Sequence, residues 1–145
     1  MAERLRGDKS ASQAAFLIAR ADIENAVAAD PGNGRKLGVL AIIDAGLEHH
    51  ELALAEALRA REQMKSSATD APIGDCNLAI VYAWTGQRDR AITTLEPLIG
   101  QPAGRNVLAQ PTYGDFKLNA LWDPLREDPR FQALVQRLAP PASKQ

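Results

Sequence analysis

Five stretches of the chain carry apolar residues three or four positions apart, and each ends at residues that favour turns. This spacing places the apolar side chains on one face of an α-helix. No run alternates β-branched and polar residues as a half-buried strand would. The pattern therefore predicts an all-α protein of short antiparallel helices, over residues 12–29, 35–47, 50–64, 72–85 and 88–99.

Small residues recur at related positions in these predicted helices. Ala53 lies 34 positions after Ala19, and Ala91 lies 38 positions after Ala53. The segment NLAIVYAWTGQRDRAITTLEPL (77–98) also contains Tyr82 and, at the expected turn, Gly86. Small residues let two helices approach closely, and glycine closes a turn without steric strain. The recurrence predicts helical hairpins that pack in a repeated way.

The spacing resembles the tetratricopeptide repeat, which has a period of about 34 residues and the pattern W-x2-L-G-x2-Y, then A-x3-F, then P. Three units share one phase. The third unit matches at Leu78, Ala79, Tyr82, Ala91 and Leu95; the second at Leu40, Ala41 and Ala57; the first at Ala19, Ile23 and Pro31.

Each unit also departs from the pattern. In the second unit, Asp44 stands at the tyrosine position and Glu48 at the position of the turn glycine. Asp75 occupies the tryptophan position of the third unit, and Arg6 the core leucine position of the first. The resemblance implies a short, degenerate superhelix of stacked antiparallel helix pairs.

The C-terminal segment contains the stretch WDPLREDPRF (122–131). This stretch resembles the end of many bacterial tetratricopeptide arrays, which often form the C-terminal portion of multidomain signalling proteins. Asp128 is a predicted N-cap, with Pro129 at the first helical position. The apolar residues after it predict a helix that covers the exposed end of the array. The residues that match are Trp122, Asp123, Pro124, Leu125, Arg126, Asp128, Pro129, Arg130 and Phe131.

These features define one expected domain over residues 12–139, with a C-terminal cap at 122–139. We expect a flexible N-terminus at 1–11 and a disordered tail at 140–145. The segment 100–117 is expected to be a long loop that could fold back across the surface formed by the first helix of each pair.

Composition and charge exclude several classes. The formal net charge is −1, from 17 basic and 18 acidic residues, which predicts no general affinity for nucleic acid or anionic membranes. No segment approaches the roughly 18 apolar residues of a membrane span. One cysteine and no apolar leader predict a soluble cytoplasmic protein.

Nothing in the sequence indicates catalysis or a cofactor. His49 and His50 are adjacent, whereas helical metal sites place histidines at i and i+4. Cys76 lacks a base within its own predicted hairpin, so a half-buried small residue is the favoured interpretation. An enzyme or metal protein that uses these three residues together with nearby carboxylates is the less favoured alternative.

In the tetratricopeptide family the first helix of each pair lines a concave groove that holds a peptide. The resemblance therefore implies a non-catalytic protein–protein interaction module, with self-association of a larger signalling protein as the alternative. Trp84 is either an anchor for a partner or packing for a neighbouring segment. When the groove positions of the family are transferred to the corresponding positions of this chain, the expected groove residues are Arg35, Lys36, Ile42, Ala45, Ile73, Asn77, Ile80 and Trp84.

Overall fold

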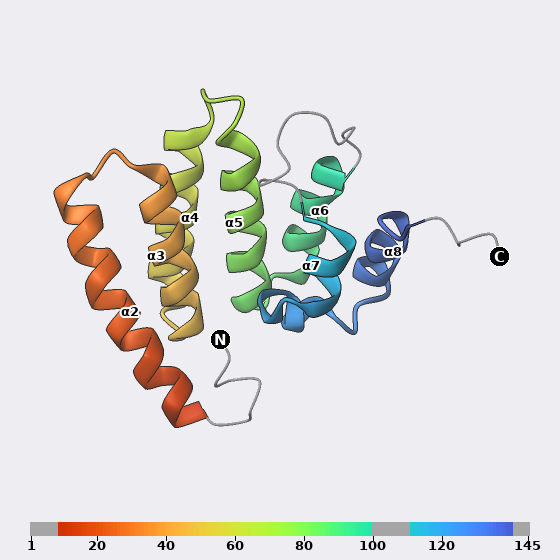
Figure 1. Cartoon of the computed structure of the whole chain (residues 1–145), viewed down its shortest axis with the longest axis horizontal. Helices are drawn as coiled ribbons and strands as arrows, with labels where there is room; N and C mark the ends of the chain where they lie inside the picture. Colours follow the sequence, from red (N-terminus) through yellow and green to blue (C-terminus); the bar gives the residue numbers. More distant parts are fainter. Residues whose placement is uncertain (1–8, 100–110, 141–145) are drawn as a thin grey trace.

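A computed structural model describes residues 9–99 and 111–140, and in these ranges the chain forms helices and turns without a strand. Figure 1 shows their arrangement. The elements are α2 (Lys9–Ala29), α3 (Gly34–Gly46), α4 (His50–Met64), α5 (Ala71–Trp84), α6 (Arg88–Ile99), α7 (Tyr113–Leu118), the 3-10 helix η1 (Ala120–Leu125) and α8 (Pro129–Arg137).

The helices pack as successive pairs, which confirms the all-α prediction. α3 pairs with α4, and α5 pairs with α6, while α5 also contacts both helices of the preceding pair (Figure 1). α4 and α6 have the predicted bounds. α2 begins at Lys9, so residues 9–11, expected in the flexible N-terminus, are helical. No described helix combines the length and the apolar character needed to cross a membrane.

Alanine at the contact points lets the paired helices approach closely. Ala53 and Ala91, which take equivalent positions in α4 and α6, are both 0% exposed. Gly34 plays a similar role at the start of α3, because a Cβ there would meet the Ala60 carbonyl oxygen at 2.8 Å. Two of the small residues that the sequence places in phase, Ala53 and Ala91, are therefore residues on which the helix pairs close; the third, Ala19, is only half-buried.

The two turns within the pairs share one hydrogen-bonding pattern, displaced by 38 residues. The His49 N–H donates to the Asp44 carbonyl at 2.9 Å, and the Gln87 N–H donates to the Tyr82 carbonyl at 2.8 Å. The residue before each donor has a positive φ, 67° at Glu48 and 80° at Gly86. A left-handed residue with this bond is the usual way to end a helix.

We expect Glu48 and Gly86 to respond oppositely to substitution. Glu48→Gly should raise the free energy of unfolding by about 0.5–1 kcal/mol, because glycine adopts the left-handed region without steric cost. Gly86→Ala should lower it by about 1–2 kcal/mol for the same reason. Urea unfolding of both variants tests this. Destabilisation by Glu48→Gly would show that the positive φ of Glu48 carries no steric cost.

The segment after α6 differs from its prediction. Residues 113–117, expected within the long loop at 100–117, belong to helix α7, and η1 follows it; the part of the expected loop at 100–110 lies outside the described residues. Phe116, Trp122 and Phe131 come together from α7, η1 and α8, with centroids 4.9–6.1 Å apart. This aromatic cluster joins the α5–α6 core.

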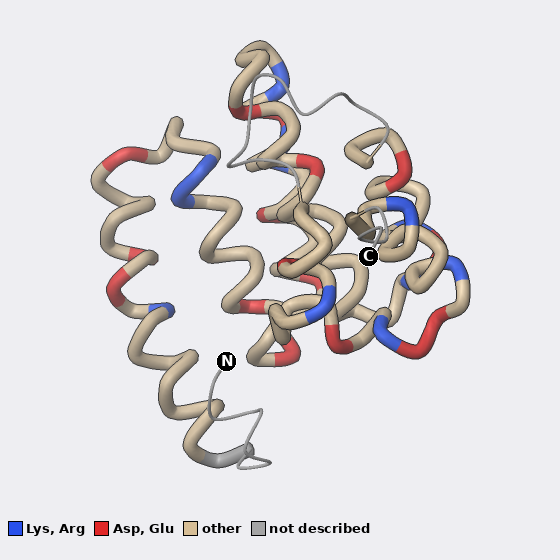
Figure 2. The backbone as a smooth tube through the Cα atoms, turned by 45° about the vertical axis from the view of Figure 1, so that its right-hand side comes forward, with Lys and Arg blue, Asp and Glu red and all other residues tan. Residues whose placement is uncertain are grey.

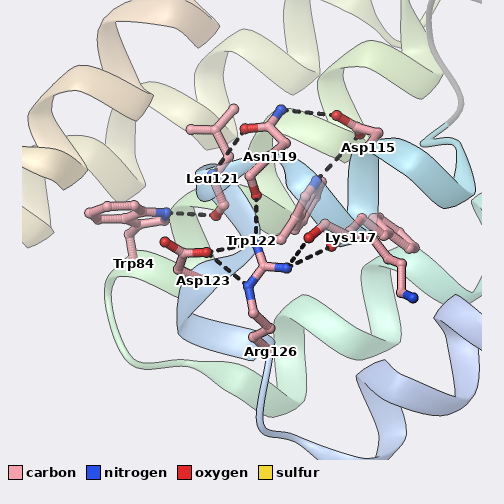
Figure 3. Close-up of polar contacts among 9 residues, drawn as sticks. Trp84, Asp115, Lys117, Asn119, Leu121, Trp122, Asp123 and Arg126 are labelled. Carbon is pink, nitrogen blue, oxygen red and sulfur yellow. Dashed lines mark hydrogen bonds and ion pairs between the residues drawn. The ribbon is translucent and has the colours of Figure 1, made fainter. Parts of the chain in front are cut away.

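Polar contacts also hold α7 and η1 together (Figure 3). The Arg126 guanidinium donates to the carbonyl oxygens of Lys117 and Asn119 and pairs with Asp123. It thereby satisfies carbonyl groups that the short helix α7 leaves free. The WDPLR stretch therefore has a structural role in holding α7 against η1.

The start of α8 confirms Asp128 as the predicted N-cap. The Asp128 carboxylate accepts from the Arg130 N–H at 2.9 Å, and the Arg130 guanidinium also reaches Asp89 in the first turn of α6 at 2.7 Å. The hydrogen bond from the Arg130 side chain lowers the pKa of Asp128 to about 2. These contacts tie α8 to α6, and Phe131, Leu134 and Val135 are buried beneath it.

Candidate partner-binding surface

Two stripes of side chains run along α3 and α5 at equivalent positions. Val39 and Asn77 occupy one such position, and Ile42 and Ile80 occupy the next. Spacings of three and four residues keep each stripe on one helix face. The sequence prediction placed Ile42, Asn77 and Ile80 in the groove but did not include Val39. The structure divides the stripes into a covered part and an open part.

The covered part lies at the C-terminal ends of the two helices. Ala45 and Ile80 are only 2% and 4% exposed, so their prediction as groove-lining residues needs correction. Ile80 belongs to the same core cluster as Phe116 and Trp122. The segment formed by α7 and η1 therefore occupies the surface on α5 that a partner was expected to use.

Trp84 packs against this same segment. Its indole N–H donates to the Leu121 carbonyl oxygen at 2.8 Å, as Figure 3 shows, and the side chain is half-buried against the core. Of the two predicted roles, the contacts fit packing for a neighbouring segment. A hollow of about 320 Å³ adjoins Trp84 and opens beside Arg88 and Pro124.

The open part lies toward the N-terminal ends of α3 and α5. Val39 is 45% exposed, while Ile42 and Ile73 are half-buried against the core. Asn77 lies over Gly38, where an added Cβ would approach its amide nitrogen to 2.5 Å. The absent side chain at Gly38 thus lets the two stripes meet.

The predicted basic pair borders this open part. Arg35 forms an ion pair with Asp70, and its hydrogen bond lowers the pKa of that carboxyl; Lys36 lies 3.3 Å from Asp30. Both pairs are exposed, and exposed ion pairs contribute about 0–1 kcal/mol. A partner with an acidic group could therefore replace either contact at little cost. Elsewhere, acidic and basic residues are scattered over the helices (Figure 2).

The structure also reveals a polar site that the sequence prediction did not find. Asp44, at the tyrosine position of the second unit, is 0% exposed. Its Oδ1 accepts from Arg20 Nε at 2.7 Å and lies 2.7 Å from His49 Nδ1. Burial acts to raise the pKa of Asp44, but the bonds from Arg20 and His49 hold it below the ordinary value. The packing of α2 on α3 brings Arg20 to Asp44, whereas His49 lies in the turn that follows α3.

The residues of the alternative enzyme prediction do not form one site. His49 pairs with Asp44, and no group of three or more metal-binding side chains occurs among the described residues. Burial, with the charges of Asp115 and Asp75, raises the pKa of the Cys76 thiol to about 12. The thiolate is the reactive form, so this environment does not favour a nucleophile.

The fold and surface define a class: an all-helical protein of antiparallel helical pairs with an aromatic C-terminal cap. No protein-family model, no curated protein and no solved structure matches this chain.

Proposed function

We propose that this chain is a non-catalytic interaction module of tetratricopeptide type that binds an extended protein segment. The observation that carries the proposal is the repetition of one hairpin geometry at a 38-residue displacement. The two turns share their hydrogen bonds and positive φ values, and the alanines at the helix contacts are equally buried. Repeated pairs of this kind present an extended surface along their first helices.

The surface that fits this role is the open part of the α3–α5 face. Val39 supplies exposed apolar area, Asn77 supplies an amide for backbone groups, and Arg35 supplies a charge with 60% of its side chain exposed. An extended peptide offers alternating side chains and free backbone N–H and C=O groups, which an apolar contact beside an amide can bind. An acidic residue of the peptide could take the place of Asp70 or Asp30 beside the basic pair.

Selection from a displayed random-peptide library, followed by calorimetry on the selected peptides, tests the proposal. Val39→Glu should weaken binding at least tenfold, which corresponds to about 1.4 kcal/mol. Arg35→Ala should mainly slow association, with an effect that fades at high salt. Leu58→Glu is the matched control, because Leu58 is 49% exposed but lies on α4.

Equal weakening by Val39→Glu and Leu58→Glu would move the binding surface away from the α3–α5 face. Failure to select any peptide, with the folded protein immobilised, would contradict the proposed activity. Trp84→Ala should reduce stability through the lost contact with Leu121 and leave peptide affinity unchanged in the molecules that remain folded.

Self-association is a second candidate, favoured by α2. Leu17 and Ile18 are 56% and 69% exposed on this helix, and exposed apolar side chains that lie together often mark interaction sites. Light scattering of the wild type and of Leu17→Glu with Ile18→Glu tests this candidate. A monomer at every concentration in the wild type would exclude it.

A further inference from the structure

The buried polar site around Asp44 includes a second carboxyl group. Glu56 of α4 is partly buried, and its carboxyl group interacts electrostatically with that of Asp44. Arg20 and Glu24 face the site from α2, Asp44 belongs to α3, and His49 stands at the turn into α4. The charged and titratable groups of three helices therefore meet at one place.

Two oxygens in this site have no donor. Asp44 Oδ2 and Glu56 Oε2 are buried and accept no hydrogen bond from any described N–H or O–H group. An ionised carboxylate can only accept, so two ionised carboxylates in contact would leave both oxygens unsatisfied and add like-charge repulsion. A proton on Glu56 converts one of these acceptors into a donor.

The charges around the site favour the same arrangement. Arg20 is the permanent cation facing three carboxyl groups, and it already binds Asp44 and, at 2.8 Å, Glu24. Asp44 also lies against His49. Glu56 has no ion-pair partner among the described residues, so it is the carboxyl group that ionises at greatest cost.

We propose that Glu56 carries a proton that it donates to Asp44, and that this shared proton clamps α2 to the α3–α4 pair in a pH-dependent manner. Loss of the proton places a second negative charge beside Asp44. The new charge competes with Asp44 for Arg20, the side chain that connects α2 to the site. The clamp is therefore closed at mildly acidic pH and weakened above neutrality.

The direction of the pH effect follows from proton linkage. Burial, then the charge of Asp44, raises the pKa of Glu56 from its ordinary value of 4.5 to about 7. The folded state then binds the proton more tightly than the unfolded chain, so the stabilisation is complete below pH 4.5 and is lost as the pH rises through about 7. Asp44 acts oppositely, because its lowered pKa stabilises only above the unfolded value.

Glu56→Gln provides the test, because the amide keeps the shape of the side chain and supplies a permanent N–H donor. Urea unfolding of the full chain should be followed from about pH 5.5 to about pH 8. Over this range the unfolding equilibrium constant of the wild type should rise on the order of tenfold more than that of Glu56→Gln. Glu24→Gln, which removes an exposed carboxylate of the same site, should retain the wild-type dependence.

A second measurement does not depend on any variant. The side-chain carboxyl carbon of Glu56, followed by NMR in the wild type, should titrate near neutral pH. Titration in the ordinary range of glutamate would overturn the proposal, as would equal pH dependence in the wild type and Glu56→Gln. Loss of the dependence in Glu24→Gln would assign it to a different carboxyl group and would equally overturn it.

Discussion

Trp122→Ala should lower the free energy of unfolding by about 3–5 kcal/mol, the usual cost of deleting a buried tryptophan side chain. Trp122 is 1% exposed and packs edge-on against Phe116, with ring centroids 5.1 Å apart. It also stacks on Phe131 of α8 at 6.1 Å. The substitution therefore leaves a cavity where α7, η1 and α8 meet the α5–α6 pair. Guanidinium unfolding, followed by circular dichroism, measures the loss.

Leu118→Ala is the matched control for this prediction, because Leu118 lies in the same segment but is 82% exposed. Its stability should stay within about 0.5 kcal/mol of the wild type. If Trp122→Ala lowers the free energy of unfolding by less than about 1 kcal/mol, the aromatic cluster of α7, η1 and α8 contributes little to folding. Trp122→Phe should recover part of the loss, since it keeps an aromatic ring in the cluster.

Arg20→Leu should lower the free energy of unfolding by about 2–3 kcal/mol, because it leaves the buried Asp44 carboxylate without its guanidinium partner. The Asp44 side chain is 0% exposed and the Arg20 side chain is 22% exposed. This partial exposure places the effect below that of a fully buried pair. Leucine retains apolar contact along α2, so the loss reports mainly on the charge. Urea unfolding at about pH 6, where Asp44 is ionised, gives the measurement.

Glu24→Ala controls for the exposed half of the same network. Glu24 pairs with Arg20 at 2.8 Å but is 57% exposed, so its removal should cost less than about 0.5 kcal/mol. Equal losses for Arg20→Leu and Glu24→Ala would show that the buried Arg20–Asp44 pair contributes no more to stability than the exposed Arg20–Glu24 pair. Retention of wild-type stability by Arg20→Leu would mean that the Arg20–Asp44 pair makes no net contribution to folding.

The helices and their turns could be predicted from sequence because their causes are local. Three- and four-residue spacing placed α4 and α6 at their observed bounds, and the cap at Asp128 followed from residue type. The 38-residue displacement between Ala53 and Ala91 also marks the equivalent turns at Glu48 and Gly86. Glu48 shows the limit of this approach, since the hydrogen bonds of the turn impose a positive φ on a residue that does not favour it.

The candidate surface was predicted only in part, because the phase of a helix fixes which residues share a face but not what covers that face. Ile80 and Trp84 belong to the expected stripe, yet η1 lies against them. Short helices such as α7 carry little periodicity, so residues 113–118 gave no helical signal of their own. Their stability comes from Phe116 in the core and from Arg126 at their carbonyl groups.

The helical class, the bounds of α4 and α6, the repeated alanine contacts and the N-cap of α8 follow from local sequence, since backbone propensity, periodicity and turn chemistry act over a few residues. Tertiary structure alone decided which parts of the α3–α5 face stay open and what the aspartate at position 44 does. Asp44 looked like a departure from the repeat pattern. It becomes a buried acid with a cationic partner because α2 brings Arg20, 24 residues earlier in the chain, to it. Such a meeting depends on how helices pack rather than on any local pattern.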